Sequence, residues 1–392
     1  MLSRVVPATV ADLLVMPTML PAAPKSLGRL SDVFISALGA ITGKNNRLGF
    51  NSVKSACVVL IDGLGSNNLR HAGGHAPFLN SLLTESKGIN TVFPSTTAAA
   101  ITSFGSAKKP GEHGVLGYSV FDREKNTVRN LLSGWSDEFA PKRFATSPSV
   151  ADLARQSNVD CYVVGPADYE GSGFSELSMS GSTYVSATNH DEASQIVLSL
   201  LKKNSRTLVY WYFPELDQAA HAYGVDSDIW LERLEVVDAT FKKFNTLIPN
   251  DVGLLVTADH GIVDVPAEGQ IMLDELNLPG IIAVTGDPRN TFIYFDDEAN
   301  SQASIEILRD RLEGKVIVAT AEEVIDKGWY PVDVEKTFMP DLFLLSEGKN
   351  ACYHRAFAKP QSLRMIGQHG SISADELIVP LLKLGKFATR RS

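Results

Sequence analysis

The sequence contains few cysteines, no long apolar segment and no excess of basic residues. Its three cysteines lie far apart and form no CxxC pair, so no disulfide framework is predicted. The longest apolar runs are much shorter than the roughly 20 residues that a membrane-spanning helix needs. The net charge of −9 and an isoelectric point near 5.4 argue against a general nucleic-acid-binding surface.

The composition is typical of a soluble globular protein. A chain of 392 residues with 44% hydrophobic and 21% charged residues can form one large or two ordinary domains. Its acidity does not exclude an anionic substrate, because bound metal ions can supply local positive charge. The first 24 residues are fairly apolar but include Asp12 and several prolines. We therefore predict no signal peptide and expect a cytoplasmic location.

Short apolar segments alternate with helical patterns along most of the chain. Residues 55–62, 207–213 and 253–258 are almost wholly apolar, which predicts strands that are buried on both faces of a parallel sheet. Further strands are expected at residues 88–93 and 160–164, helices at 27–41, 67–71, 76–85, 97–103, 149–156, 191–202, 226–247 and 373–384, and a loop at 171–181. This alternation predicts an α/β fold with a mainly parallel central sheet and helices on both faces.

The pattern changes between residues 265 and 347. Short apolar runs there surround a single helical pattern at residues 301–313, and the last run is at 341–345. We interpret residues 265–347 as a smaller inserted α+β cap. The core domain would then consist of residues 1–264 and 348–392, with residues 1–50 as an N-terminal arm that packs on it.

Acidic residues and histidines follow three of the apolar segments. Asp62 ends the first, Asp217 follows the second, and Asp259 follows the third. In open α/β sheets, ligands bind at the carboxyl ends of the strands. His221 comes four residues after Asp217, so both side chains can lie on one face of a helical turn, and His260 comes directly after Asp259. Carboxylates and imidazoles without thiolates favour Zn²⁺, with Mn²⁺ as the second choice.

A hydroxyl-containing turn at residues 93–97 follows an apolar run and precedes a run of small residues. At such a strand-to-helix turn, free backbone N–H groups and the helix dipole favour negative charge. Taken alone, this pattern is more typical of an ordinary helix N-cap. With Thr97 and with His369, which lies in a glycine-flanked loop, the set contains six metal-ligand candidates and one hydroxyl. That is enough for two ions with open coordination positions, the arrangement used in phosphoryl transfer.

Six segments in this order resemble the alkaline phosphatase superfamily, and most closely its type I phosphodiesterase/nucleotide pyrophosphatase family. The segments are VVLIDGLG (58–65), FPSTT (93–97), GEHGVLGY (111–118), DQAAHAYG (217–224), TADHG (257–261) and GQHG (367–370). The resemblance implies an alkaline-phosphatase-like catalytic core. It also implies metal-dependent hydrolysis of phosphodiester or nucleotide pyrophosphate bonds in a small-molecule substrate, through a phospho-threonine intermediate.

The resemblance also assigns roles to the candidate residues. Thr97 matches the nucleophile by its spacing from the preceding Phe-Pro, and Thr96 is the competitor. His113 matches a structural turn of the family and is left out of the metal set. One metal would be held by Asp217, His221 and His369, and the second by Asp62, Asp259 and His260 together with the oxygen of Thr97.

Two departures from the family pattern keep other activities open. Ala100 occupies the position where the phosphodiesterases usually carry an Asn that binds a phosphoryl oxygen. The sulfatase signature C/S-x-P-x-R is missing, which argues against sulfate esters as substrates. A phosphomonoesterase, phosphonate hydrolase or phosphomutase stays an alternative, and a non-catalytic metal-binding protein is a remote one. Arg289 could contact a phosphate, but we favour a surface salt bridge for it.

Overall fold

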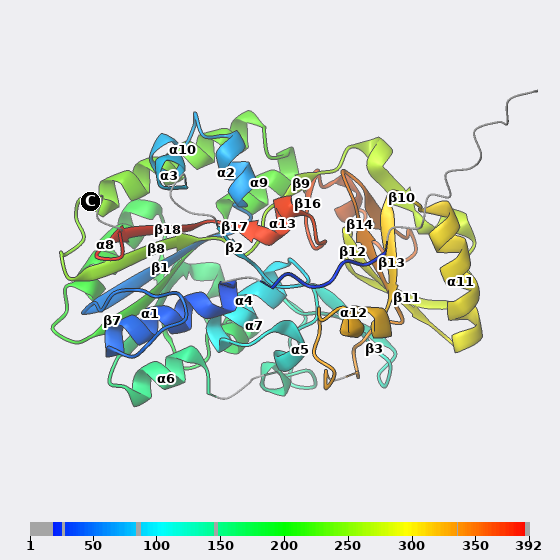
Figure 1. The fold of residues 1–392 in the computed structure, drawn as a ribbon, viewed down its shortest axis with the longest axis horizontal. Coiled ribbons are helices and arrows are strands. Elements are labelled where there is room, and N and C mark those ends of the chain that lie inside the picture. Colours follow the sequence, from blue (N-terminus) through cyan, green and yellow to red (C-terminus); the bar gives the residue numbers. More distant parts are fainter. Residues whose placement is uncertain (1–18, 26–27, 84–87, 145–147, 335, 389–392) are drawn as a thin grey trace, which may run out of the picture.

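The computed structural model describes residues 19–25, 28–83, 88–144, 148–334 and 336–388. The predictions for the first 18 residues, including the absence of a signal peptide, lie outside the described residues, and the cytoplasmic location stays a prediction. Within the described ranges, no helix is both long and apolar enough to cross a membrane. Figure 1 shows a larger lobe around a six-stranded sheet and a smaller lobe around a four-stranded sheet.

The larger sheet is mainly parallel, as the sequence predicts. In pairing order its strands are β18 (Leu381–Gly385), β8 (Val252–Thr257), β1 (Ser55–Ile61), β7 (Thr207–Phe213), β5 (Asp160–Pro166) and β6 (Thr183–Ala187). Only β18 runs antiparallel to its neighbour among these described strands. β1 lies at the centre, and all of its residues are buried. Its continuous apolar pattern follows from this burial on both faces.

Helices cover both faces of this sheet (Figure 1). Successive residues of β7 show the two faces, because Tyr210 packs on Phe34 and Phe104 while Trp211 packs on Phe241 and Phe244. One layer contains α1 (Val33–Thr42), α4 (Thr97–Ser106) and α6 (Val150–Gln156), and the other contains α3 (Pro77–Leu83), α8 (His190–Leu201) and α10 (Asp228–Asn245). These observations confirm the predicted fold class.

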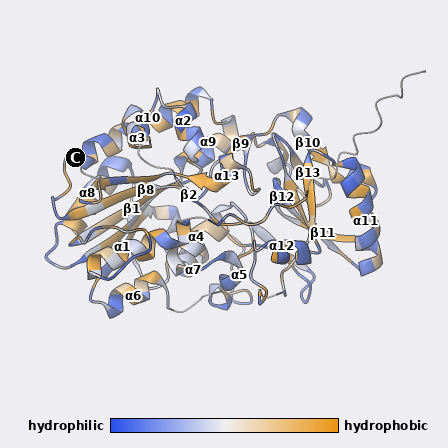
Figure 2. Ribbon diagram, in the orientation of Figure 1, coloured by the Kyte–Doolittle hydropathy of each residue, from blue (hydrophilic) through white to orange (hydrophobic). Residues whose placement is uncertain are grey.

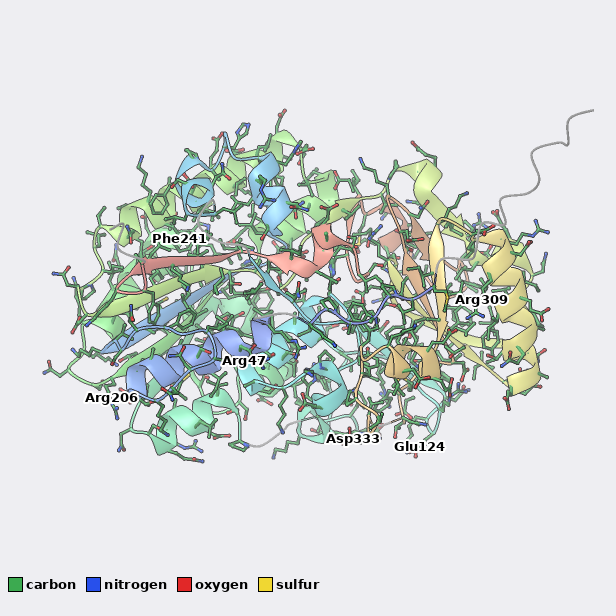
Figure 3. The ribbon with its side chains drawn as sticks, viewed as in Figure 1. Arg47, Glu124, Arg206, Phe241, Arg309 and Asp333 are labelled. Carbon is green, nitrogen blue, oxygen red and sulfur yellow. The ribbon has the colours of Figure 1, made fainter. Side chains whose placement is uncertain are left out.

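The longest helix shows why the sequence predicts an amphipathic element there. α10 buries side chains at a spacing of three or four residues, so they form one stripe that faces the core. Phe241, labelled in Figure 3, belongs to this stripe. Ser227 caps the helix by accepting a hydrogen bond from the amide of Trp230.

The smaller lobe is built on an antiparallel sheet. Its strands pair in the order β11 (Ile281–Asp287), β12 (Asn290–Phe295), β14 (Leu342–Ser346) and β13 (Val316–Thr320), and its helices are α11 (Glu298–Arg311) and α12 (Ala321–Asp326). The strands of both sheets are mostly hydrophobic in Figure 2. A hairpin of β3 (Ser119–Asp122) and β4 (Thr127–Asn130) also packs on this sheet, where Phe121 contacts Tyr294. The division into a core domain and a cap stays a prediction.

Three predicted elements are wrong in detail. Residues 373–384 form the short helix α13 (Ala374–Leu377), β17 (Ile378–Val379) and then β18, because the edge of β8 provides a pairing partner and Pro380 cannot continue the helix. Of residues 88–93, only β2 (Ile89–Asn90) is a strand, and it pairs with β17. The expected loop at 171–181 contains α7 (Gly173–Ser178), which Ser172 caps.

Candidate active site

The three central parallel strands bring the predicted site residues to one edge of the larger sheet. β1 leads directly into Asp62, and β8 leads into Asp259 and His260. β7 leads into α9 (Glu215–Tyr223), which carries Asp217 in its first turn and His221 in its last. Because these strands are neighbours and run in the same direction, segments that are far apart in the sequence meet at their carboxyl ends.

The first cluster surrounds His260. The Nε2 atom of this imidazole lies 3.4 Å from Asp62 Oδ1, 3.4 Å from Asp259 Oδ2 and 3.1 Å from Thr97 Oγ1. Asp259 and His260 are 0% exposed, and Asp62 is 3% exposed. The other carboxylate oxygen of Asp259 accepts hydrogen bonds from the amides of Gly63 and His260. The free oxygen of Asp259 is therefore directed toward the cluster.

The second cluster surrounds Asp217. Its Oδ1 atom lies 3.4 Å from His221 Nε2 and 4.0 Å from His369 Nε2. Ligand atoms of these three residues lie within 4.8 Å of one another, and so do those of Asp62, Asp217 and His260. By this geometry Asp217 belongs to both clusters, whereas the resemblance assigns it to one metal.

All three imidazoles have the same hydrogen-bonding arrangement. The Nδ1 atom of His221 donates to the carbonyl of Gly367 at 2.6 Å, and that of His369 donates to the carbonyl of Ser95 at 2.9 Å. His260 Nδ1 lies 3.3 Å from the carbonyl of Gly261. A backbone carbonyl can only accept, so Nδ1 carries a proton, and Nε2, which faces the carboxylates, is the atom that can bind a metal. Metal-binding histidines are commonly oriented in this way.

The electrostatics of the site favour a bound cation. Within the described part of the chain, Asp62 Oδ1, Asp217 Oδ1 and Asp259 Oδ2 are buried and have no hydrogen-bond donor. Burial, and then repulsion by Asp259 and Asp217, raises the pKa of Asp62 well above its usual range. Burial, and then repulsion by His260 and His221, lowers the pKa of His369. Buried anionic groups of this kind are normally paired or coordinate metals, so these residues fit divalent cations.

The two candidate nucleophiles point in different directions. Thr97 is the first residue of α4, and its hydroxyl contacts His260. Thr96 is the N-cap of α4 and is 1% exposed, and its hydroxyl donates to Asp287 Oδ1 at 3.1 Å. Of the two hydroxyls, only that of Thr97 contacts the first cluster, and its role as nucleophile stays a prediction. Ala100 is fully buried in the core of the larger lobe and leaves no polar group at the family's Asn position.

Other residues singled out from the sequence lie away from the two clusters. His113 is buried, contacts Ser103 Oγ at 2.8 Å, and has its pKa lowered by burial to about 3, which fits a structural turn. The predicted surface salt bridge of Arg289 is wrong, because its side chain is 0% exposed and pairs with the equally buried Glu376. Reasoning from sequence missed Glu376, which belongs to no motif, and assigned no role of its own to Asp287.

An aromatic cavity of about 520 Å³ opens beside the clusters. Asp62, Thr97 and Asp217 line one part of it. Its aromatic lining consists of Trp135, Tyr169, Phe174, Tyr184, Tyr210 and Tyr212. The hydroxyl of Tyr212 donates to Asp62 Oδ2, which links the cavity wall to the first cluster. These aromatic residues come from four separate stretches of sequence, so no local pattern could have identified the cavity.

This combination of a mainly parallel sheet, clustered carboxylates and imidazoles, and a threonine at a helix start defines an enzyme of the alkaline phosphatase superfamily. The chain belongs to the type I phosphodiesterase/nucleotide pyrophosphatase family, whose sequence model matches residues 56–372. It is therefore a hydrolase that acts on phosphodiester or diphosphate bonds. In a search of curated proteins, no sequence matches it significantly.

Solved structures share its fold at low sequence identity. Murine ectonucleotide pyrophosphatase/phosphodiesterase 5 matches with a TM-score of 0.67 and 15% identity, over 84% of this chain and 88% of that chain. An inactive threonine-to-alanine variant of the murine protein, in complex with AMP, matches with a TM-score of 0.67 and 14% identity over 85% and 88%. The human protein matches with a TM-score of 0.65 and 15% identity over 86% and 90%.

Proposed function

We propose that this enzyme hydrolyses phosphodiester or nucleotide pyrophosphate bonds in two steps, through a phospho-threonine intermediate at Thr97. The observation that carries the proposal is the position of the Thr97 hydroxyl. It begins α4 and lies 3.1 Å from His260 Nε2, within a buried cluster of carboxylates and imidazoles.

Two divalent cations, Zn²⁺ by preference and Mn²⁺ as the second choice, fit the donor set. One would be held by Asp217, His221 and His369, and the other by Asp62, Asp259, His260 and the Thr97 oxygen. When bound, such cations lower the pKa of a coordinated hydroxyl and neutralise charge on phosphoryl oxygens.

The chain itself would position the nucleophile and stabilise the developing charge. The Thr97 hydroxyl gives its proton to solvent water, and Oγ1 attacks phosphorus in line with the leaving oxygen, which departs and takes a proton from water. The first intrahelical bond of α4 runs from the amide of Ala100 to the carbonyl of Thr96 at 2.9 Å. The amides of Ala98 and Ala99 therefore have no acceptor within the helix and can donate to the non-bridging oxygens.

These amides could replace the side-chain donor that is missing at Ala100. Water then attacks the phosphorus of phospho-threonine on the face opposite Thr97 Oγ1; the bond between phosphorus and Oγ1 breaks, the attacking water loses a proton to solvent, and Oγ1 takes up a proton to restore the free hydroxyl. In both steps the charge on the equatorial oxygens is where electrostatic stabilisation acts most strongly.

The aromatic cavity supports a nucleotide as the substrate. Tyr169 and Tyr212 lie with their ring centroids 5.8 Å apart, and Trp135 and Phe174 line the same space as Thr97. Flat aromatic walls beside a few polar groups suit a nucleobase, which stacks on aromatic rings. The AMP complex of the murine structural neighbour supports the same substrate class.

The test of this proposal compares a diester with a monoester. Wild-type protein reconstituted with Zn²⁺ should hydrolyse bis-p-nitrophenyl phosphate faster than p-nitrophenyl phosphate. Thr97→Ala should lower kcat by more than about 10³-fold, as expected for loss of a nucleophile, and keep its metal content. Thr96→Ala is the matched control and should keep most of the activity.

Three results would count against the proposal. Activity retained in Thr97→Ala would exclude this residue as the nucleophile. Faster hydrolysis of the monoester would favour a phosphomonoesterase. Metal binding without turnover of either substrate would favour a non-catalytic metal-binding protein.

A further inference from the structure

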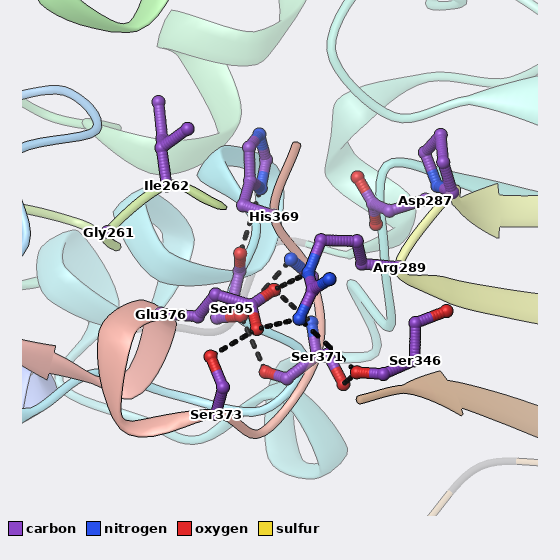
Figure 4. A network of polar contacts seen from close by, with 12 residues as sticks. Ser95, Gly261, Ile262, Asp287, Arg289, Ser346, His369, Ser371, Ser373 and Glu376 are labelled. Atoms are coloured by element: carbon purple, nitrogen blue, oxygen red, sulfur yellow. Dashed lines mark hydrogen bonds and ion pairs between the residues drawn. The ribbon is translucent and has the colours of Figure 1, made fainter. Parts of the chain in front are cut away.

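A buried ion pair joins the smaller lobe to α13. Arg289 follows β11 in the smaller lobe, and Glu376 belongs to α13 (Figure 4). Arg289 Nε contacts Glu376 Oε1 at 2.8 Å, and Arg289 Nη2 contacts Oε2 at 2.9 Å. Both side chains are 0% exposed. Two parallel charge-assisted hydrogen bonds fix the mutual orientation of these groups.

The remaining donors of Arg289 are also used. Its guanidinium donates to the carbonyls of Ser346 at 3.3 Å, Gly348 at 2.9 Å and Asn350 at 2.7 Å. With the two bonds to Glu376, all five N–H groups of the side chain have acceptors. The guanidinium is thus held firmly by the end of β14 and the turn that follows it, and it provides a fixed anchor for Glu376.

Glu376 in turn contacts the segments that follow His369 and His260. Its Oε1 accepts from the amide of Ser371 at 2.9 Å, and its Oε2 accepts from the hydroxyl of Ser373 at 2.6 Å. Its backbone carbonyl accepts from the amide of Gly261 at 3.0 Å. Ser371 is two residues after His369, and Gly261 directly follows His260.

Ser95 extends this network to the imidazole of His369. The Ser95 hydroxyl donates to the carbonyl of Ser371 at 2.7 Å and accepts from the amide of Gly370 at 3.2 Å. The Ser95 carbonyl accepts from His369 Nδ1 at 2.9 Å. A continuous path of hydrogen bonds therefore runs from Arg289 to the ring of His369, as Figure 4 shows.

We propose that the Arg289–Glu376 pair is a positioning device that fixes His369, and through Gly261 also His260, for cation binding. This inference rests on the proposed function. A buried ion pair contributes little net stability compared with apolar residues of the same size, so its presence here calls for another reason. Orienting groups behind metal ligands typically change metal affinity by 10–100-fold when they are lost. By this inference, the smaller lobe also shapes the metal site.

The main test removes both charges together. In the double variant Arg289→Met/Glu376→Gln no unpaired charge stays buried, and the Gln can still accept from the amide of Ser371. Zn²⁺ affinity is measured by chelator competition, the Co²⁺ absorption spectrum reports ligand geometry, and calorimetry reports folding. We expect one cation to bind about 10–100-fold more weakly, with an altered Co²⁺ spectrum.

The control is a second, partly exposed Arg–Glu pair, which lies within the smaller lobe. Arg309 Nη2 contacts both carboxylate oxygens of Glu323 at 2.9 and 3.0 Å, and Arg309 lies on α11 (Figure 3). The control variant Arg309→Met/Glu323→Gln should keep wild-type Zn²⁺ affinity and the wild-type Co²⁺ spectrum. Equal losses of Zn²⁺ affinity in both double variants would overturn the inference, because removing any Arg–Glu pair would then weaken cation binding.

A milder variant covers the case in which the double variant does not fold. Ser95→Ala removes the hydroxyl between Ser371 and Gly370 and leaves the ion pair intact, and it should also weaken Zn²⁺ binding. Wild-type affinity in the folded double variant, or in Ser95→Ala if the double variant does not fold, would overturn the inference and leave the proposed function standing. A wild-type protein that binds no divalent cation would overturn both.

Discussion

Asp287 offers a test of how burial changes the pKa of a single carboxyl group, and with it the stability of the protein. It ends β11, is 6% exposed, and accepts hydrogen bonds from Thr96 Oγ1 at 3.1 Å and from the amide of Tyr118 at 3.4 Å. Arg289, two residues away, directs its guanidinium to Glu376 instead. Burial raises the pKa of Asp287 from 3.8 to about 7, and the two hydrogen bonds only partly oppose this.

The sign of the effect follows from proton linkage. The folded state holds this proton more tightly than the unfolded state, so the stabilisation is complete below pH 3.8 and is lost as the pH rises toward 7. Each pKa unit corresponds to about 1.4 kcal/mol. Between pH 5 and pH 8, Asp287 should therefore lower the free energy of unfolding by about 3 kcal/mol.

The variant Asp287→Asn removes this titration. Its amide can accept from Tyr118 and donate to Thr96, so both contacts can persist. Urea denaturation of the metal-free protein at pH 5, 6, 7 and 8 measures the effect. Between pH 5 and pH 8 the variant should gain about 3 kcal/mol in free energy of unfolding relative to wild type. Parallel curves for the two proteins would refute the reasoning.

Three further predictions concern the metals and the helix that carries Thr97. Chelation should abolish diesterase activity, and Zn²⁺ or Mn²⁺ should restore it; activity that is indifferent to chelator would exclude a metal mechanism. Phe104→Ala should lower the free energy of unfolding by about 3–5 kcal/mol, because this buried ring stacks on Phe34; a loss below about 1 kcal/mol in chemical denaturation would contradict this. Ala100→Asn should destabilise the protein by about 1–3 kcal/mol without raising kcat, since the amide would be buried in the core; a gain in kcat would contradict this.

The central sheet could be predicted because its strands are identified by their own composition. β1, β7 and β8 are buried on both faces, so they consist of continuous apolar runs that need no knowledge of their neighbours. The acidic residues that follow them then lie at one edge by the geometry of a parallel sheet. The local sequence pattern gave a wrong prediction at residues 373–384. This segment could also be helical, but much of it pairs with strands instead, and β18 pairs with β8.

The candidate site could likewise be predicted only where local structure determines the position of a residue. Asp62, Asp259 and His260 follow strands directly, and Asp217 and His221 share a helix, so their positions follow from local structure. The partners of Arg289 could not be predicted in this way. Glu376 is 87 residues away in sequence, and the pairing depends on how the smaller lobe packs against α13. Net charge and motif spacing contain no information about such a contact.

The most direct test of the central claim is a crystal structure of the protein grown with Zn²⁺, with anomalous scattering recorded at the zinc edge. The account predicts two anomalous peaks. One should be bounded by Asp217, His221 and His369, and the other by Asp62, Asp259 and His260 with Thr97 Oγ1 beside it. The absence of both peaks, or zinc bound only elsewhere on the protein, would contradict the account.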